Sequence, residues 1–195
     1  MTKNIVIIQG HPDPKGGHFD HMLGDTYARA AESAGHTVST IHVANLEFPI
    51  LRSKEDWNSG PVMKDIEVAQ SLIRDADHLV LVYPLWLGSM PALVKGFLEQ
   101  VLRPGFALEN SSEGGFPKGK LKGKSARIIV TMGMPAFFYR LFYGSHSLKS
   151  LERNILRFCG IKPVKSTVIG LVEGISGVKC RQIKKNIAKL AAAAR

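Results

Sequence analysis

Short apolar runs typical of β-strands alternate with helical patterns along the whole chain, and this alternation constrains the fold more than any other feature. The strand candidates are Asn4–Gln9, Thr37–Val43, Asp77–Tyr83, Ala126–Thr131 and Val164–Gly170. The helix candidates are His18–Ala34, Val62–Asp75, Pro91–Leu102, Ser147–Cys159 and Ser176–Ala194. The first, third and fourth strand candidates are nearly continuous in Val, Ile and Leu, as expected of parallel strands covered on both faces. Strict alternation predicts an α/β fold with a doubly wound open sheet.

The length of 195 residues suits one domain with a sizeable core, so we expect residues 1–195 to form a single domain. The first apolar run ends in a loop of Gly and Pro, which indicates a β-strand rather than a signal peptide. Apolar runs such as Leu79–Val82 are too short to span a bilayer. Two cysteines, Cys159 and Cys180, define no disulfide framework, so a cytoplasmic location is expected.

The chain is basic, with 26 Lys and Arg against 16 Asp and Glu and a net charge of +10. Such a charge suits nucleic acid, an anionic membrane or protein surface, or an anionic cofactor or substrate. The two densest stretches are Lys118–Arg127 and Lys179–Lys189. Neither interleaves aromatic with basic residues as single-strand binders do. We therefore expect two solvated basic faces and no nucleic-acid partner.

An apolar loop, Pro84-Leu85-Trp86-Leu87, follows the third strand candidate. Loops that leave a strand are usually polar because they run over the surface. Pro91 then opens a helix, where its missing N–H costs nothing. Open α/β sheets bind ligands at the carboxyl ends of their strands, so this loop suits a flat, largely apolar ring. The alternative is that Trp86 only packs against the following helix or a dimer partner.

The loop after the first strand, Gly10 to Asp20, contains three glycines, two prolines and several cationic or imidazole side chains. A glycine-rich turn before a helix N-terminus favours phosphate, because free N–H groups and the helix dipole point at it. The spacing matches neither GxGxxG nor a P-loop, and a plain turn is the alternative. Since one loop without cysteine would have to supply every ligand, we expect no metal at His11, His18 and His21.

Three segments together resemble the flavodoxin-like NAD(P)H:quinone oxidoreductases, the DT-diaphorase group and its bacterial relatives. They are GHP with the later HFD, YPLW with MPALVKGF, and IIVTMGMP with Tyr139 and NILRFCG downstream. The resemblance implies a three-layer flavodoxin-like fold with a five-stranded parallel sheet of order 2-1-3-4-5. In such a sheet the carboxyl ends of strands one, three and four adjoin the switch point where ligands bind, and the three segments follow those strands.

The resemblance also implies roles for individual residues. Around the flavin phosphate or diphosphate it puts His11, His18, Phe19 and Asp20. Along the isoalloxazine ring it puts Pro84, Leu85, Trp86 and Leu87, with Thr131 and Gly133 touching the ring from the fourth strand's loop. Tyr139 and His146 are the catalytic candidates, which would stabilise charge on the reduced ring or hydrogen-bond the acceptor. Leu87, Met134 and Pro135 depart from the family pattern.

The implied activity is two-electron reduction of quinones by NAD(P)H with ping-pong kinetics, in a homodimer whose site forms at the subunit interface. We expect FAD as the cofactor, with FMN as the alternative. A second hypothesis is an accessory flavoprotein whose basic surface docks on an anionic membrane or on a transporter such as a potassium efflux system. A third, an electron-carrier flavodoxin, is disfavoured by the positive charge. Aromatic residues at Phe137–Tyr143 suit a pocket wall or an oligomer surface.

Overall fold

Five parallel strands form one sheet of order β2-β1-β3-β4-β5 in the computed structural model, which describes residues 2–109 and 117–194. The strands are β1 (Asn4–Gln9), β2 (Thr37–His42), β3 (His78–Pro84), β4 (Ser125–Thr131) and β5 (Val164–Ile169). Every strand expected from the sequence is present, with bounds that differ by at most one residue at each end. The predicted α/β architecture and strand order are therefore confirmed.

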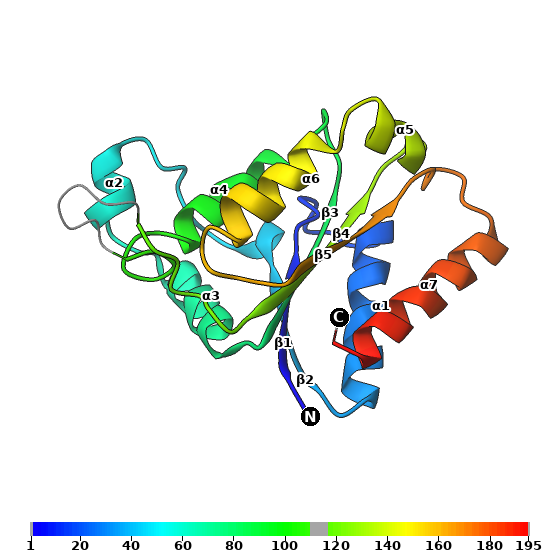
Figure 1. The fold of residues 1–195 in the computed structure, drawn as a ribbon, viewed down its shortest axis with the longest axis horizontal. Helices are drawn as coiled ribbons and strands as arrows, with labels where there is room; N and C mark the ends of the chain where they lie inside the picture. The colour runs from blue at the N-terminus through cyan, green and yellow to red at the C-terminus, as the bar shows by residue number, and fades with distance from the viewer. Residues whose placement is uncertain (1, 110–116, 195) are drawn as a thin grey trace.

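Helices cover both faces of the sheet (Figure 1). The α-helices are α1 (Phe19–Ser33), α2 (Lys54–Ser59), α3 (Lys64–Asp75), α4 (Ala92–Val101), α5 (Ala136–Leu141), α6 (His146–Ser150) and α7 (Gly177–Ala192). A 3-10 helix, η1, spans Val43–Asn45, and α6 continues as a π-helix, η2, over Leu151–Leu156. In place of the single helix expected over Ser147–Cys159, the structure has an α-helix followed directly by a π-helix. The six-residue helices α2 and α5 were not expected from the sequence.

Two hydrophobic cores lie on the two sides of the sheet. One packs α1 and α7 against alternate residues of the central strands, including Ile5, Ile7, Val80 and Ile129. The other packs α3, α4 and the α6–η2 segment against the opposite set, such as Val6 and Leu79. Because both faces of β1, β3 and β4 are covered, these strands need the continuous apolar sequence that predicted them.

Backbone hydrogen bonds continue past the strands and fix the loops at the carboxyl edge of the sheet. Gly10 N donates to Val82 O at 2.7 Å, and Leu85 N donates to Thr131 O at 2.7 Å. A Cβ at Gly10 would meet Val94 Cγ2 at 2.8 Å, so glycine alone allows α4 to approach β1 this closely. The loops after β1, β3 and β4 therefore start from one rigid edge.

Arg103 holds the long connection between β2 and α3 against the end of α4. It is buried, and its guanidinium donates to Trp57 O at 3.1 Å, to Pro61 O at 3.1 Å and to two further carbonyls of the α2 region. A planar guanidinium with five donors can satisfy several carbonyls at once. The second long connection expected, Arg103 to Lys124, includes residues 110–116, which lie outside the described residues.

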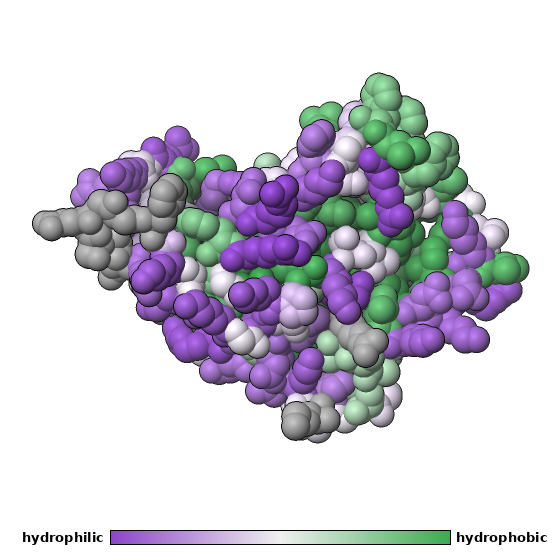
Figure 2. Space-filling model, viewed as in Figure 1, coloured by the Kyte–Doolittle hydropathy of each residue, from purple (hydrophilic) through white to green (hydrophobic). Residues whose placement is uncertain are grey.

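Hydrophobic side chains gather on the surface over α5 (Figure 2). We call the set Phe137, Phe138, Leu141, Phe142 and Tyr143 the α5 patch. The exposed fractions of Phe137, Leu141 and Phe142 are 66%, 82% and 72%. In residues 2–109 and 117–194, no helix has the length and apolar character needed to cross a membrane.

Candidate functional site

A pocket of about 280 Å³ opens at the carboxyl edge of the sheet, where the loops after β1, β3, β4 and β5 meet. The residues that line it are His11, His18, Phe19, Asp20, Pro84, Leu85, Trp86, Thr131, Met132, Gly133, Val172 and Glu173. Nine of the twelve residues expected in a site from the sequence are in this set. The structure therefore brings the three sequence segments together around one hollow.

His11 presents a donor to this pocket in its neutral form. Its Nδ1 accepts a hydrogen bond from the backbone N–H of Asp13 at 3.2 Å, which leaves the Nε2 proton for another acceptor. Burial, together with the positive charge of His18 and His21, lowers the pKa of His11 to about 4. At neutral pH, His11 is thus a neutral hydrogen-bond donor at the start of α1.

His18 completes the polar end of the pocket. Its ring stacks on His11 with centroids 3.8 Å apart, and its Nε2 lies 2.8 Å from Asp13 Oδ2. His18 is also the N-cap of α1, but its side chain makes no capping hydrogen bond. The first-turn N–H groups of α1 therefore keep their capacity for an external acceptor, and the helix dipole favours an anion there.

The loop after β3 makes a tight two-residue turn. Trp86 and Ser89 exchange backbone hydrogen bonds of 2.8 and 2.9 Å, with Leu87 and Gly88 between them at φ values of 47° and 76°. Positive φ at both central positions is the pattern of a type I′ turn, which usually takes Asn and Gly. Trp86 remains half exposed beside the pocket, whereas the Leu87 side chain is fully exposed and does not line it.

Asp20 and Thr131 connect α1 with the end of β4 at the floor of the pocket. The Thr131 hydroxyl lies 3.0 Å from each carboxylate oxygen of Asp20, and both residues are buried. Burial raises the pKa of Asp20 to about 6, against the opposing effect of the Thr131 hydrogen bond. A group that titrates near neutral pH therefore sits inside the pocket.

A smaller hollow of about 180 Å³ adjoins the first, and His11 lines both. It extends toward the end of β2 and is lined by residues that include His21, His42 and Asn45. The Nδ1 atom of His21 is buried there and has no hydrogen-bond partner among the described residues. Within residues 2–109 and 117–194, no group of His, Cys, Asp or Glu has the arrangement to hold a metal ion.

Tyr139 and His146, the two catalytic candidates, lie apart from the residues that line the pocket. Tyr139 is buried, with its hydroxyl 2.8 Å from Ser147 Oγ and accepting from the Leu148 N–H at 3.3 Å. His146 is exposed at the start of α6, and its ring packs against Gly144. In this chain, Tyr139 joins α5 to α6 through hydrogen bonds, and neither side chain is brought to the pocket of the single subunit.

Val172 and Glu173 line the pocket but were not expected from the sequence. They follow β5, whose carboxyl end lies beside that of β4 in the sheet. A Cβ at Gly133 would lie 3.1 Å from Glu173 Oε1, so this carboxylate closes on the loop after β4. Only the position after a strand could have indicated these residues, since neither belongs to a recognisable motif.

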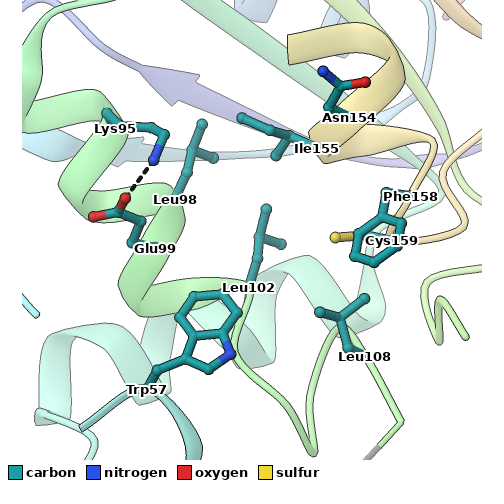
Figure 3. A pocket seen from close by; sticks show the side chains of 10 residues that line it. All are labelled: Trp57, Lys95, Leu98, Glu99, Leu102, Leu108, Asn154, Ile155, Phe158 and Cys159. Atoms are coloured by element: carbon teal, nitrogen blue, oxygen red, sulfur yellow. Dashed lines mark hydrogen bonds and ion pairs between the residues drawn. The ribbon is translucent and has the colours of Figure 1, made fainter. Parts of the chain in front are cut away.

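A separate hollow of about 180 Å³ lies between α4, the end of η2 and α2 (Figure 3). Its walls are mostly apolar, with Trp57, Leu102 and Phe158 around it and the Lys95–Glu99 ion pair on one side. None of the residues that line it follows the end of a strand, and they form no group with catalytic chemistry. The Cys159 thiol borders it, but burial raises the pKa of that thiol to about 12, which keeps it unreactive.

We expect the stability of the cofactor-free protein to rise as Asp20 becomes protonated. Its pKa is about 6 in the fold against an ordinary value of 3.8. The contribution of Asp20 to stability is therefore fully present below pH 3.8 and is lost as the pH rises through 6. Relative to Asp20→Asn, wild type should gain about 2 kcal/mol between pH 8 and pH 4, since each pKa unit is worth about 1.4 kcal/mol. Urea unfolding across this range measures the difference.

Glu32→Gln, an exposed position on the same helix, is the matched control for removal of a carboxylate from α1. If the Asp20→Asn difference from wild type is constant with pH, burial does not raise the pKa of Asp20 and its proposed environment is wrong.

Comparison with known proteins gives the same fold. The model of a family described as having a flavodoxin-like fold matches residues 3–194. The solved structure of an FMN-dependent NADH-azoreductase from Bacillus anthracis, in complex with FMN, aligns with a TM-score of 0.73 over 97% of this chain and 98% of that chain. The two sequences are 15% identical, so this likeness concerns the fold.

Curated relatives extend the comparison to sequence. An uncharacterized NAD(P)H oxidoreductase of Haemophilus influenzae is 32% identical over 171 residues, which cover 86% of this chain and 83% of that protein. Human ribosyldihydronicotinamide dehydrogenase (quinone) is 29% identical over 82% of this chain and 78% of that protein. The potassium-efflux ancillary protein KefG of Cronobacter sakazakii is 42% identical over 72% of this chain and 64% of that protein. The chain belongs to the flavodoxin-like NAD(P)H:quinone oxidoreductase family.

Proposed function

We propose that this protein is a flavin-dependent NAD(P)H oxidoreductase that reduces quinones or similar acceptors by two-electron transfer. The observation that carries the proposal is the convergence of the loops after β1, β3, β4 and β5 on one pocket with a polar and an apolar end. The polar end has His11, His18 and the uncapped start of α1, which suit phosphate. The apolar end has Pro84, Leu85 and Trp86, which suit a flat ring.

The residues present fit a flavin. His11 and His18, with the backbone of Phe19 and Asp20, would hold the phosphate. Gly16 and Gly17 have φ values of 73° and 78° and open space around their α-carbons, so this loop can close on an anion. A flavin held here would supply the capacity to accept hydride from NAD(P)H and to reduce a quinone. The protein would bind and orient the flavin and keep water from its reacting face.

We propose FMN as the cofactor, in place of the FAD expected from the sequence, with FAD as the alternative. The structural relative from Bacillus anthracis is described as FMN-dependent. FAD would need further space for its adenosine, and the hollow toward His21, His42 and Asn45 is where this chain offers it.

The flavin proposal predicts a yellow protein that binds FMN through its first loop. His18→Ala should weaken FMN affinity by about tenfold or more, because it removes a ring stacked on His11 and a donor at the anion site. The measurement is fluorescence titration of the flavin-stripped protein, followed by mass identification of the flavin that co-purifies.

The matched control for this titration is His36→Ala, since His36 lies at the opposite edge of the sheet, where it accepts from Lys3 N. Its FMN affinity should change by less than about twofold. A protein that takes up neither FMN nor FAD would falsify the flavin assignment.

NAD(P)H and the quinone would use the same open face of the pocket in turn, which supports ping-pong kinetics. Tyr139 and His146 remain our candidates for contact with the reacting groups. For Tyr139 this requires its hydroxyl to exchange its present partner, Ser147 Oγ, for the substrate or cofactor. The alternative role for Tyr139 is to hold α5 and α6 in place.

Two variants separate these roles for Tyr139. If its hydroxyl acts on the reacting groups, Tyr139→Phe should lower kcat by about tenfold or more, whereas Ser147→Ala should leave kcat within about twofold of wild type. If the hydroxyl only anchors α5 to α6, the two variants should lower kcat equally. Steady-state kinetics with NADPH and a soluble quinone distinguish the outcomes, and parallel double-reciprocal lines check the ping-pong order.

We further propose that two copies associate through the α5 patch, so that each copy covers the other's pocket. Contiguous exposed apolar surface of this kind marks interaction sites on soluble proteins. The rings of Phe138 and Phe142 stack at 4.9 Å and leave their outer faces open. Trp86 and Leu87 are exposed just after β3, and α5 follows β4 at the same carboxyl edge of the sheet, so a partner on α5 would close the apolar end of the pocket.

Charge placed in the α5 patch should therefore separate the subunits. Leu141→Asp combined with Phe142→Asp is expected to give a monomer, because two carboxylates would be buried without partners in the interface. Val178→Asp on α7 is the control, since Val178 is also an exposed apolar residue but lies outside the patch. Sedimentation velocity measures the state, and a wild-type protein that is monomeric at micromolar concentration contradicts the proposal.

A second candidate function is an accessory subunit of a potassium efflux system. The observation that favours it is the 42% identity with KefG over 140 residues. The basic surface would then dock on an acidic face of the transporter. Salt-sensitive co-purification with a transporter, in the absence of rapid quinone turnover, would favour this function over the enzyme. We infer a cytoplasmic location for either function from the two free cysteines.

A further inference from the structure

A second hollow with distinct chemistry lies at the amino edge of the sheet, opposite the flavin pocket. Its volume is about 410 Å³, within the range of small-molecule sites. It is bounded by the segments just before β1, β3, β4 and β5 and by the end of α7. The residues that line it are Lys3, His78, Gly123, Ser125, Ala126, Lys162, Pro163, Lys165, Ala193 and Ala194, and none of these is acidic.

His78 is the buried polar group of this hollow. Its exposed fraction is 1%, and its Nδ1 lies 2.8 Å from Ser125 Oγ on the neighbouring strand. Its Nε2 is buried without a hydrogen-bond partner in residues 2–109 and 117–194. Buried side-chain nitrogens are nearly always paired, so an unpaired one beside a hollow indicates a missing partner.

The charged side chains that line the hollow have one sign, although the Asp77 carboxylate lies nearby, where it accepts from Asn4 N at 2.8 Å. Lys3, Lys162 and Lys165 line the hollow, and the buried Arg127 lies behind it, where it donates to Thr167 Oγ1 at 2.9 Å. Burial and the charges of Lys3, Arg127 and His36 lower the pKa of His78 to about 4. At neutral pH the ring is therefore neutral. In the tautomer whose Nδ1 accepts from the Ser125 hydroxyl, the Nε2–H is a donor without an acceptor.

Helix ends account for only part of this charge. α7 ends at the hollow, where its carbonyls attract cations, and Lys3 Nζ lies 3.5 Å from Ala194 O. Lys124, next to the hollow, donates to the carbonyls of Arg74 and Ala76 at the end of α3. The side chains of Lys162 and Lys165, in contrast, make no ion pair or hydrogen bond with the described residues. Their charge has no structural role in the single subunit.

We propose that the hollow at the amino edge is a second anion site, which binds a small phosphate-bearing molecule up to the size of a nucleoside monophosphate. A phosphate has several acceptor oxygens, which can take the Nε2–H of His78 and the lysine ammonium groups from different sides. The volume exceeds that of a bare phosphate ion, which leaves room for an organic remainder. The proposal does not depend on flavin binding, because the two sites lie at opposite edges of the sheet.

Pyrophosphate is the probe for this site, used with the flavin-loaded protein so that the first-loop site is filled. Isothermal titration should give one saturable site. Lys162→Gln with Lys165→Gln should weaken it by about tenfold or more, because two charge-assisted contacts are lost. Lys149→Gln with Lys185→Gln removes the same charge from exposed positions outside the hollow, and should change affinity by less than about twofold.

Imidazole NMR provides a second readout that needs no substitution. Pyrophosphate should shift the His78 ring signals of wild type and leave those of His146 in place. Citrate, which offers carboxylates, should bind more weakly if the site selects phosphate. Equal pyrophosphate affinity in the two double variants, or an unmoved His78 signal at saturation, overturns the proposal. If the protein takes up no flavin, the first-loop site stays empty and could also bind pyrophosphate. The same titration on Lys15→Gln protein, whose first loop has lost a cation, then tests the site at the amino edge.

Discussion

The parallel register of β1, β3 and β4 is the constraint on which the candidate site depends. Gln9 pairs with Val82, and Pro84 pairs with Thr131, so these strands end nearly level with one another. The ladder then continues into the loops through the Gly10–Val82 and Leu85–Thr131 hydrogen bonds. Three segments that are far apart in sequence therefore leave the sheet within reach of one ligand, and their backbones are fixed before any ligand arrives.

Electrostatic balance in the candidate pocket at the carboxyl edge follows from burial more than from formal charge. Burial disfavours the cationic form of His11 and the anionic form of Asp20. It lowers the pKa of His11 to about 4 and raises the pKa of Asp20 to about 6. The pocket thus offers neutral donors and the dipole of α1 to an incoming phosphate. Because fixed dipoles and N–H groups need not be desolvated as ions must, they bind an anion at lower cost than buried charges would.

Continuous apolar runs predicted the strands because burial on both faces requires them, and the three loops could be placed because they follow those strands. Helices α2 and α5 escaped prediction because six residues are too few for a helical periodicity to emerge. The expectation that the basic stretch Lys118–Arg127 is solvated was wrong for two of its residues. Arg127 and Lys124 belong to a stretch expected to be solvated, yet Arg127 is buried and Lys124 donates to two carbonyls. The position of Tyr139 depends on its bond to Ser147, which spacing does not encode.

Leu87 connects the strained turn after β3 with the surface proposed for dimerisation. A leucine at φ 47° in the left-handed region is unfavourable, and its side chain is fully exposed to water. Neither feature benefits the isolated subunit, since Asn would fit the turn and a polar side chain would suit the solvent. Both become intelligible if a partner covers the carboxyl edge, because burial of Leu87 would then offset the backbone cost. The turn that shapes the apolar end of the pocket would in that case be stabilised by the same contact that closes it.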